Sequence, residues 1–502
     1  MKNLFASLLV FMCLHAFAQI SLVKDFVPGS GNGSPEHLTV FNNKLYFAAK
    51  NGASTGRQLW SVDSTDSVRL EHDFSTFGGD MFSEDYAYEG FAVAGGKLYF
   101  NAEGDGHPTY SLWSFDGTTL TNINDTMELP NFLTEMDGKV YMAGANAAYG
   151  TELWKYDPAT GKLKRRSDIN PGSLTAVPKD LTAYNHKLYF SAYNSTTVGT
   201  ELYVYDPVTD TTSLVSDINP GINGSTPWNL TVYQNKLYFT ATTAAYGMEL
   251  YSYDGTTVTR LTDYVTGPTD GVKGFDASLA LYGREVIGYN NAIYFGGDTV
   301  GSCHQLARYN IATGTTTLIS KILGCQTPQG FVVYKNKLYF TGNDFTHGYE
   351  LWVYDSAGGM QLVEDLNTGT GSSWPYSITV FNNSLYFAAT DGIHGTELFK
   401  YHDTTAIHTG VQNLFFKGEV SVYPNPVSSV FNIDVTLKSA EEITIRVVDM
   451  NGKEVYQTTN GNCMAGKNTF VVPTTQLLPG TYFYQVLNNT GRLYFNGKVL
   501  KE

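Results

Sequence analysis

Residues 230–263 read LTVYQNKLYFTATTAAYGMELYSYDGTTVTRLTD, and this stretch decides the fold. Its apolar residues alternate in four short runs, which predicts four strands. The runs are separated by turn signals, including Asn235-Lys236 and Gly255-Thr256. Asn and Gly tolerate the positive φ that two-residue hairpins need. We therefore expect a four-stranded antiparallel meander, which is the unit of a β-propeller blade.

The same pattern occurs eight times along the chain. The tyrosine of its LYF element marks each copy, at spacings of 42 to 56 residues: Tyr46, Tyr99, Tyr141, Tyr189, Tyr238, Tyr294, Tyr339 and Tyr386. A repeat of this length, made of strands, cannot bury its own apolar faces and must stack on its neighbours. The 35 tyrosines and 29 phenylalanines, without long helical periodicity, favour an all-β protein.

The two ends of the repeat region predict a closed ring. Residues 21–35, SLVKDFVPGSGNGSP, match the fourth strand and exit loop of an internal copy, SLVSDINPGINGSTP at 213–227. The last copy stops at Asp403 without a fourth strand. Residues near Leu22 to Phe26 are therefore expected to complete the final blade of an eight-bladed propeller over residues 19–403. The alternatives are an open solenoid or two smaller rings.

The first 18 residues predict a secretory signal peptide. Lys2 is followed by a mostly apolar run to Phe17 and a small-residue cleavage site that ends at Ala18. The run is too short to span a bilayer stably, and no later stretch is apolar enough, so the protein is expected not to span a membrane. The net charge of −15 argues against nucleic acid and anionic lipid as partners.

Three cysteines remain after the signal peptide. Cys303 and Cys325 lie in one repeat, so a disulfide between them is one alternative in an oxidising compartment. Spacing does not decide it. Cys463 lies in a different segment and is expected to be unpaired. The chain has no CxxC, so no redox or zinc motif is indicated.

A second recurrent element is ELWxYD or a close variant. It occurs at Glu152-Leu153-Trp154, Glu201-Leu202-Tyr203, Glu249-Leu250-Tyr251, Glu350-Leu351-Trp352 and Glu397-Leu398-Phe399. This element resembles the ELWxxDGT repeat family of secreted bacterial proteins, and the resemblance covers about residues 20–403. It implies a propeller-like fold and carries no general activity that transfers to this chain.

After the repeats, residues 404–419 are expected to be a linker and residues 420–502 a small immunoglobulin-like β-sandwich of about seven strands. This last segment resembles the C-terminal sorting domain of the type IX secretion system of Bacteroidetes. The matching features are Tyr423-Pro424-Asn425-Pro426, Asp449-Met450-Asn451-Gly452, Leu478-Pro479-Gly480-Thr481-Tyr482 and the lysine-bearing tail Lys498 to Lys501. The alternative is an immunoglobulin-like adhesive module.

The resemblance to the sorting domain implies a route. The signal peptide takes the chain into the periplasm, and the C-terminal domain then engages the type IX machinery and crosses the outer membrane. In the family this domain is typically removed, and the cargo is released or attached to surface lipopolysaccharide. The protein is therefore expected to be secreted or to lie on the outer cell surface.

The glutamates of the ELW element recur in most copies, so blade symmetry would place them in a ring: Glu152, Glu201, Glu249, Glu350 and Glu397. Such a ring could bind a cation such as calcium, or a polyol. The alternative is that each carboxylate accepts hydrogen bonds within its own blade, and repetition in most blades favours this architectural role. The chain has no DxDxDG-type loop, and no cofactor is predicted.

The six tryptophans divide into two groups. Four occupy the third strand of a copy and are expected in the core: Trp60, Trp113, Trp154 and Trp352. Trp228 and Trp374 are placed by the sequence in loops between blades, where an aromatic ring could stack on a sugar. Because the loops at one end of a propeller share a face, His347 and His394 are expected on the same side. Packing between blades is the favoured alternative for both tryptophans.

No catalytic motif stands out. The chain has no HExxH, no GxSxG and no P-loop, and its YDGTT turn does not satisfy the sialidase Asp-box. The leading hypothesis is an exported, non-catalytic binding or adhesion protein, with the propeller as a platform for glycan or protein. One alternative is a carbohydrate-active enzyme with its site in the propeller funnel. Another is a purely structural surface protein.

Overall fold

The structure is a computed structural model. It describes residues 20–52, 56–74, 79–82, 90–104, 106–123, 127–272, 285–299, 303–319, 327–356, 358–404, 420–437, 440–448, 454–488 and 493–502. The chain divides into two compact units, Met1–Thr404 and Thr405–Glu502, and each is described by itself. The expected signal peptide and nearly all of the expected linker lie outside the described residues.

The first unit consists of eight four-stranded antiparallel sheets, which we call blades 1 to 8 in chain order. The first strands are β2 (Glu36–Phe41), β6 (Ala92–Ala94), β10 (Glu128–Met136), β14 (Lys179–Tyr184), β18 (Trp228–Tyr233), β22 (Val286–Tyr289), β26 (Gln329–Tyr334) and β30 (Tyr376–Phe381). The second strands are β3 (Lys44–Lys50), β7 (Lys97–Gly104), β11 (Lys139–Asn146), β15 (Lys187–Asn194), β19 (Lys236–Thr243), β23 (Ala292–Thr299), β27 (Lys337–Asn343) and β31 (Ser384–Ala389).

The outer half of each blade completes the meander. The third strands are β4 (Arg57–Val62), β8 (His107–Phe115), β12 (Gly150–Asp157), β16 (Gly199–Asp206), β20 (Gly247–Tyr253), β24 (Cys303–Asn310), β28 (Tyr349–Asp355) and β32 (Glu397–Tyr401). The fourth strands are β5 (Val68–His72), β9 (Leu120–Asn122), β13 (Lys162–Arg165), β17 (Thr211–Ser216), β21 (Val258–Arg260), β25 (Thr315–Leu318), β29 (Gly359–Leu362) and, for blade 8, β1 (Ile20–Lys24).

The turn between the first and second strands has the geometry that its residues predict. Asn42 and Asn43 have φ of 45° and 58°, and the Gly95-Gly96 turn has 55° and 73°. Two consecutive positive φ values define the hairpin turn whose twist matches that of the flanking strands. In blade 5 the turn is Gln234-Asn235, with φ of 46° and 57°, one residue before the expected Asn235-Lys236, because Lys236 already begins β19.

The apolar core lies between blades. Eight buried clusters each combine residues of two consecutive blades. Tyr46 of blade 1, for example, packs in the same cluster as Phe100 of blade 2, and Tyr386 of blade 8 packs with Phe47 of blade 1. Because the clusters link blade 8 back to blade 1, the eight sheets form a closed series, consistent with an eight-bladed β-propeller.

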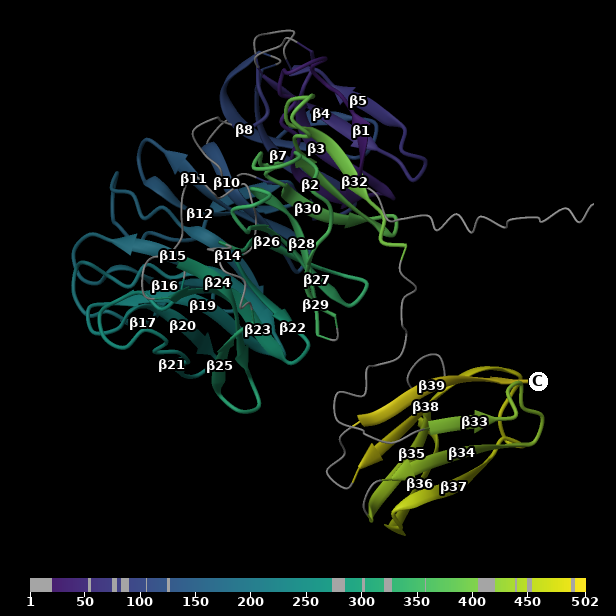
Figure 1. Ribbon diagram of the computed structural model, residues 1–502. Coiled ribbons are helices and arrows are strands. Elements are labelled where there is room, and N and C mark those ends of the chain that lie inside the picture. Colours follow the sequence, from purple (N-terminus) through teal and green to yellow (C-terminus); the bar gives the residue numbers. More distant parts are fainter. Residues whose placement is uncertain are drawn as a thin grey trace, which may run out of the picture. The chain divides into compact units, whose positions relative to one another are not determined.

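The N-terminal strand supplies the last blade with its fourth strand. β1 pairs antiparallel with β32, and Ile20 lies opposite Tyr401 and Leu22 opposite Phe399. In Figure 1 this purple strand lies beside the green end of the first unit. The arrangement is the one that the shifted repeat predicts, and it leaves blade 8 with as many strands as the others.

The first strands carry a feature that the sequence pattern does not predict. Most of them contain a β-bulge near their start, as between Lys179 and Thr182 in β14. One residue of the bulge is left-handed, with φ of 52° at Asp180 and 59° at Asn229. The Asp180 carboxylate accepts a hydrogen bond from the backbone N–H of Leu230, at 2.6 Å. The bulge thus directs a side chain toward the first strand of the next blade.

The second unit is a two-sheet sandwich of seven strands. One sheet has the order β33-β34-β37 and the other β36-β35-β38-β39. The strands are β33 (Val420–Tyr423), β34 (Val430–Leu437), β35 (Glu441–Val448), β36 (Glu454–Cys463), β37 (Gly466–Pro473), β38 (Gly480–Asn488) and β39 (Leu493–Lys501). A single cluster that includes Phe431, Ile445 and Val486 fills the space between the sheets. No helix among the described residues has the length and hydropathy needed to cross a membrane.

Candidate binding face

Two kinds of loop lie at the same end of the blades, and together we name them the loop face. They are the loops between second and third strands and the loops from each fourth strand to the next blade. Trp374 belongs to the loop between blades 7 and 8, and its ring stacks on that of Tyr349, with centroids 3.9 Å apart and planes 18° apart. The Trp374 backbone N–H also donates to the Tyr349 carbonyl, at 3.1 Å. Trp374 is 37% exposed, so this stacked pair presents aromatic surface to solvent.

Two histidines occupy equivalent second-to-third strand loops of blades 7 and 8. Nδ1 of His347 lies 2.8 Å from the Asp344 carboxylate, and Nδ1 of His394 lies 2.8 Å from that of Asp391. The hydrogen bond to the aspartate raises the pKa of each histidine. His347 lies two residues before Tyr349 and so belongs to the neighbourhood of Trp374, whereas His394 belongs to the next blade.

Trp228 differs from its expected position. It is the first residue of strand β18 and is 9% exposed, so it does not lie in a loop. Its ring contacts Phe132 edge to face, with centroids 6.2 Å apart. The bulky apolar side chain is thus used for packing at the start of an inner strand. Of the four residues proposed from the sequence as ligand contacts, Trp374, His347 and His394 lie in loops and Trp228 begins a strand.

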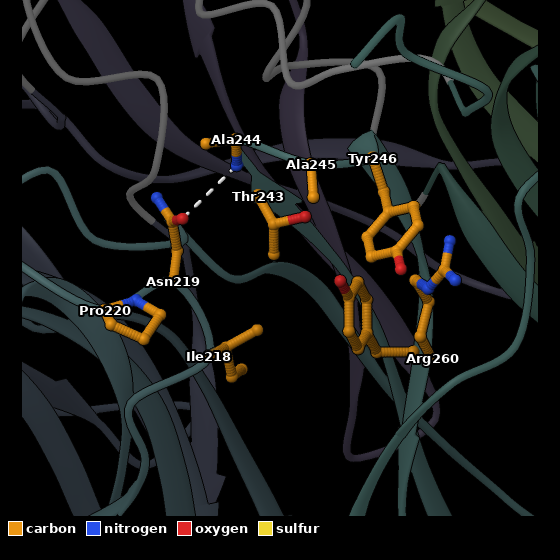
Figure 2. Close-up of a pocket in the computed structure, with 9 residues that line it drawn as sticks. Ile218, Asn219, Pro220, Thr243, Ala244, Ala245, Tyr246 and Arg260 are labelled. Atoms are coloured by element: carbon orange, nitrogen blue, oxygen red, sulfur yellow. Dashed lines mark hydrogen bonds between the residues drawn. The ribbon is translucent and has the colours of Figure 1, made fainter. Parts of the chain in front are cut away.

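A pocket of about 380 Å³ lies on the loop face at the junction of blades 4 and 5. Figure 2 shows Ile218, Asn219 and Pro220 on one side and Ala244, Ala245 and Tyr246 on the other. Tyr251 and Arg260 complete the lining. The Asn219 side-chain oxygen accepts a hydrogen bond from the Ala244 N–H, at 3.2 Å, which joins the two sides. Aromatic and apolar walls with a few polar groups are typical of ligand sites.

Arg260 is held over the ring of Tyr246 in this pocket, with its guanidinium carbon 3.3 Å from the ring centroid. Its Nη1 lies 3.3 Å from the Asp263 carboxylate. Blade 3 repeats the arrangement, because the Arg165 guanidinium carbon lies 4.0 Å from the Tyr149 ring centroid. The sequence pattern common to both stacked pairs is a Tyr-Gly pair at the start of the third strand and an arginine three residues before an aspartate, Asp168 in blade 3 and Asp263 in blade 5. The sequence reasoning did not single it out.

The five glutamates of the ELW element are all fully buried. Each carboxylate accepts hydrogen bonds from a loop that follows a fourth strand. Glu201 accepts from the Ser225 hydroxyl at 2.5 Å and from the Asn219 N–H at 3.0 Å. Glu350 accepts from the Ser373 hydroxyl and from the Ser373 N–H. The remaining members have equivalent partners: Glu152 with Ser167 and Asn170, Glu249 with Thr262 and Tyr264, and Glu397 with Phe26, Val27 and Gly33.

Each glutamate thus ties the third strand to the exit loop of its own blade. Burial raises the pKa of Glu249 and of Glu350 to about 7, against the lowering effect of their hydrogen bonds. No cluster of three or more metal-ligating side chains occurs among the described residues. The geometry fits the architectural role better than a shared cation site.

The cysteines are only partly described. Cys463 is a free, buried thiol in β36. Cys325 and the side chain of Cys303, which the sequence offers as one possible disulfide, lie outside the described part of the chain.

The motif residues of the second unit hold its C-terminal strand. Asn425 donates from its side-chain nitrogen to the Lys498 carbonyl at 3.1 Å, and its side-chain oxygen accepts from the Leu500 N–H at 2.9 Å. Tyr423 ends β33, and Pro424 and Pro426 flank Asn425. Gly480 begins β38, and the Tyr482 hydroxyl donates to the Leu478 carbonyl at 2.9 Å. The Asp449 to Gly452 motif lies outside the described residues.

Comparison with known families agrees with the sorting-domain resemblance of the second unit. Residues 421–500 match the secretion system C-terminal sorting domain. The second unit is therefore a type IX sorting domain, a class of module that engages the type IX secretion machinery. The protein that carries it is secreted by this system or lies on the outer cell surface.

Solved structures offer a more distant similarity. PorZ, a surface component of the type IX secretion system of Porphyromonas gingivalis, is 13% identical with a TM-score of 0.42, over 92% of this chain and 68% of PorZ. A puromycin-hydrolyzing peptidase of Mycobacterium tuberculosis is 10% identical with a TM-score of 0.45, over 73% of this chain and 60% of the peptidase. No curated protein matches the chain. The similarities to solved structures assign no activity at these values.

Proposed function

We propose that the protein is an exported, non-catalytic binding protein whose first unit is an eight-bladed β-propeller. Its loop face binds a glycan or protein outside the cell, and the sorting domain directs export. The proposed boundaries are a signal peptide at 1–18, the propeller at 19–403, a linker at 404–419 and the sorting domain at 420–502. Release, or attachment to lipopolysaccharide after loss of the sorting domain, belongs to the same proposal.

The pocket between blades 4 and 5 is the observation that carries this proposal. Tyr246 is 38% exposed, and its ring is already held by the guanidinium of Arg260. An aromatic ring that is fixed before the ligand arrives loses little side-chain entropy on binding. Trp374, fixed on Tyr349, offers a second pre-ordered aromatic surface on the same face. Rings of this kind suit apolar contact with a sugar ring or with a protein side chain.

A polysaccharide panel tests the proposal on the full mature chain. Binding is followed by tryptophan fluorescence and calorimetry, and release of reducing ends is followed in parallel. We expect binding without product, and at least tenfold weaker binding for Tyr246→Ala or Arg260→Ala. Tyr423→Ala in the sorting domain is the matched control, because this tyrosine is similarly exposed, at 45%. Release of reducing ends would identify an enzyme. If the loop-face variants bind with unchanged affinity, the loop face is not the binding site and this part of the proposal is wrong.

A further inference from the structure

Three consecutive inner strands begin with a distinctive set of side chains. β10 carries Asn131-Phe132, β14 begins with Lys179-Asp180, and β18 begins with Trp228-Asn229. The pairs are equivalent, because Asn131, Lys179 and Trp228 each pair with the second strand just before the bulge. We name these six residues the β10–β14–β18 cluster. It lies at the end of the inner strands that is reached from the loop face.

The two aromatic side chains of the cluster, Phe132 of β10 and Trp228 of β18, contact each other. The rings of Phe132 and Trp228 meet at 6.2 Å and 79°, although one belongs to blade 3 and the other to blade 5. β14 contacts both β10 and β18, so it lies between them. The strand that begins with Lys179 and Asp180 therefore lies between the two strands that carry the rings. Asp180 is held there by its hydrogen bond from the Leu230 N–H, at 2.6 Å.

Lys179 has no ion-pair or hydrogen-bond partner for its ammonium among the described residues, and no nearby carboxylate offsets its burial. Burial lowers the pKa of this lysine. Other lysines of the chain are paired, as Lys187 is with Asp206 at 2.9 Å. A partly buried ammonium without a counter-charge is unfavourable and is ready to accept an anion.

Two amide side chains of the cluster also have one atom each without a hydrogen-bond partner. The side-chain oxygen of Asn131 and the side-chain nitrogen of Asn229 are buried and have no hydrogen-bond partner. Asn229 as a whole is 9% exposed. Buried polar groups are nearly always hydrogen-bonded, so such exceptions need a reason. One acceptor, one donor and one cation of the cluster thus lack a partner among the described residues.

We propose that the β10–β14–β18 cluster binds a carboxylate-bearing sugar residue. The Lys179 ammonium pairs with the carboxylate, the Asn131 oxygen accepts from a sugar hydroxyl, and the Asn229 amide donates to another oxygen. The half-buried Phe132 ring, backed by Trp228, contacts an apolar face of the sugar. This inference rests on the proposed function. It places an acidic residue of the bound glycan at the β10–β14–β18 cluster, whose residues are distinct from those that line the pocket of Tyr246 and Arg260.

Calorimetry with the full mature chain tests this assignment, with oligogalacturonate as the acidic probe and a neutral galacto-oligosaccharide of equal length as its match. We expect the acidic probe to bind at least tenfold more tightly than the neutral one. Loss of a charge-assisted hydrogen bond predicts that Lys179→Gln weakens binding about tenfold or more. Lys187→Gln is the control, because it removes a lysine that already has a partner.

A second variant keeps the test independent of folding defects at Lys179. Asn229→Asp replaces the amide donor by a carboxylate, so both probes lose a hydrogen bond and only the acidic probe is also repelled. Its binding should therefore weaken by a larger factor than that of the neutral sugar. Thermal melts of each variant establish that the fold is kept. Equal affinity for both probes, unchanged affinity in Lys179→Gln, or failure of oligogalacturonate to bind would each overturn the inference. If other members of the polysaccharide panel still bind, the proposed function stands without it.

Discussion

The Glu397 carboxylate accepts a hydrogen bond from the backbone N–H of Phe26 at 2.8 Å, although the two residues are 371 positions apart. The same carboxylate accepts from the Gly33 N–H at 2.9 Å. In the other blades with this glutamate, the partners lie within 24 residues of it. The glutamate of blade 8 therefore joins the last third strand to the N-terminal segment of the repeat region. Its equivalents join a third strand to an exit loop that is close in sequence.

Ring closure should depend on this carboxylate. Glu397→Gln removes a charged acceptor and leaves buried N–H groups poorly satisfied, so we expect the free energy of unfolding to fall by about 2–4 kcal/mol. Chemical denaturation measures the loss. The exposed Glu128→Gln is the matched control and should change stability by less than about 0.5 kcal/mol. A Glu397→Gln protein as stable as the control would show that β1 pairing alone closes the ring.

The stability of the propeller should depend on pH through Glu249 and Glu350. Their pKa values are raised by burial to about 7, above the usual carboxyl value. A raised pKa in the folded state gives stability that is complete below the unfolded pKa and is lost as pH rises through about 7. We expect the free energy of unfolding to fall between pH 5 and pH 8, by roughly 1–3 kcal/mol per group. In the Glu249→Gln, Glu350→Gln double variant, the free energy of unfolding should decline less steeply with pH. An unchanged slope would show that these two glutamates do not cause the pH dependence.

Chelation should leave the fold intact. The carboxylates of the ELW glutamates are occupied by hydroxyl and N–H donors in separate blades, so no calcium is needed to satisfy them. We expect the same melting temperature with EDTA and with millimolar calcium. A calcium-dependent rise of more than about 4 °C would indicate a bound ion and would revive the cation alternative for these residues.

Asn425 should control the order of the C-terminal strand. Its side chain bonds to both Lys498 and Leu500, so Asn425→Ala removes two hydrogen bonds from β39. We expect faster amide hydrogen exchange at 498–502 and earlier proteolysis there, with a global loss of about 1–2 kcal/mol. Asn432→Ala is the comparison, since its contact with the Tyr423 carbonyl is long, at 3.5 Å. Equal exchange in both variants would remove Asn425 from this role.

The repeat-level features could be predicted because each depends on a local rule that recurs. The Asn42-Asn43 turn needs only the positive φ that its residues tolerate, and the burial of Trp60 follows from strand alternation. The shifted strand count likewise requires β1 to pair with β32. Because the repeat occurs eight times, each of these local patterns could be recognised in several copies.

The candidate sites were harder to predict because they depend on departures from the repeat. The left-handed bulge at Asp180 cannot be inferred from KDLTAY, which looks like an ordinary strand. Trp228 likewise begins strand β18 and does not lie in a loop, which its polar neighbours in the sequence do not indicate. The stacking of Arg260 on Tyr246 joins a loop to a strand fourteen residues on, so it requires the three-dimensional register. Such pairings are set by tertiary packing, which one sequence does not display.

The pairing of β1 with β32 also sets an order of events. β1 is synthesised first, but its partner follows more than 370 residues later, so the blade-8 sheet cannot form until the last repeat exists. The sorting domain begins only after that repeat. A chain cut short before that repeat therefore contains β1 but lacks both the strand with which β1 pairs and the sorting domain. Because of this order of segments, every chain that carries the sorting domain also carries all the strands of the ring.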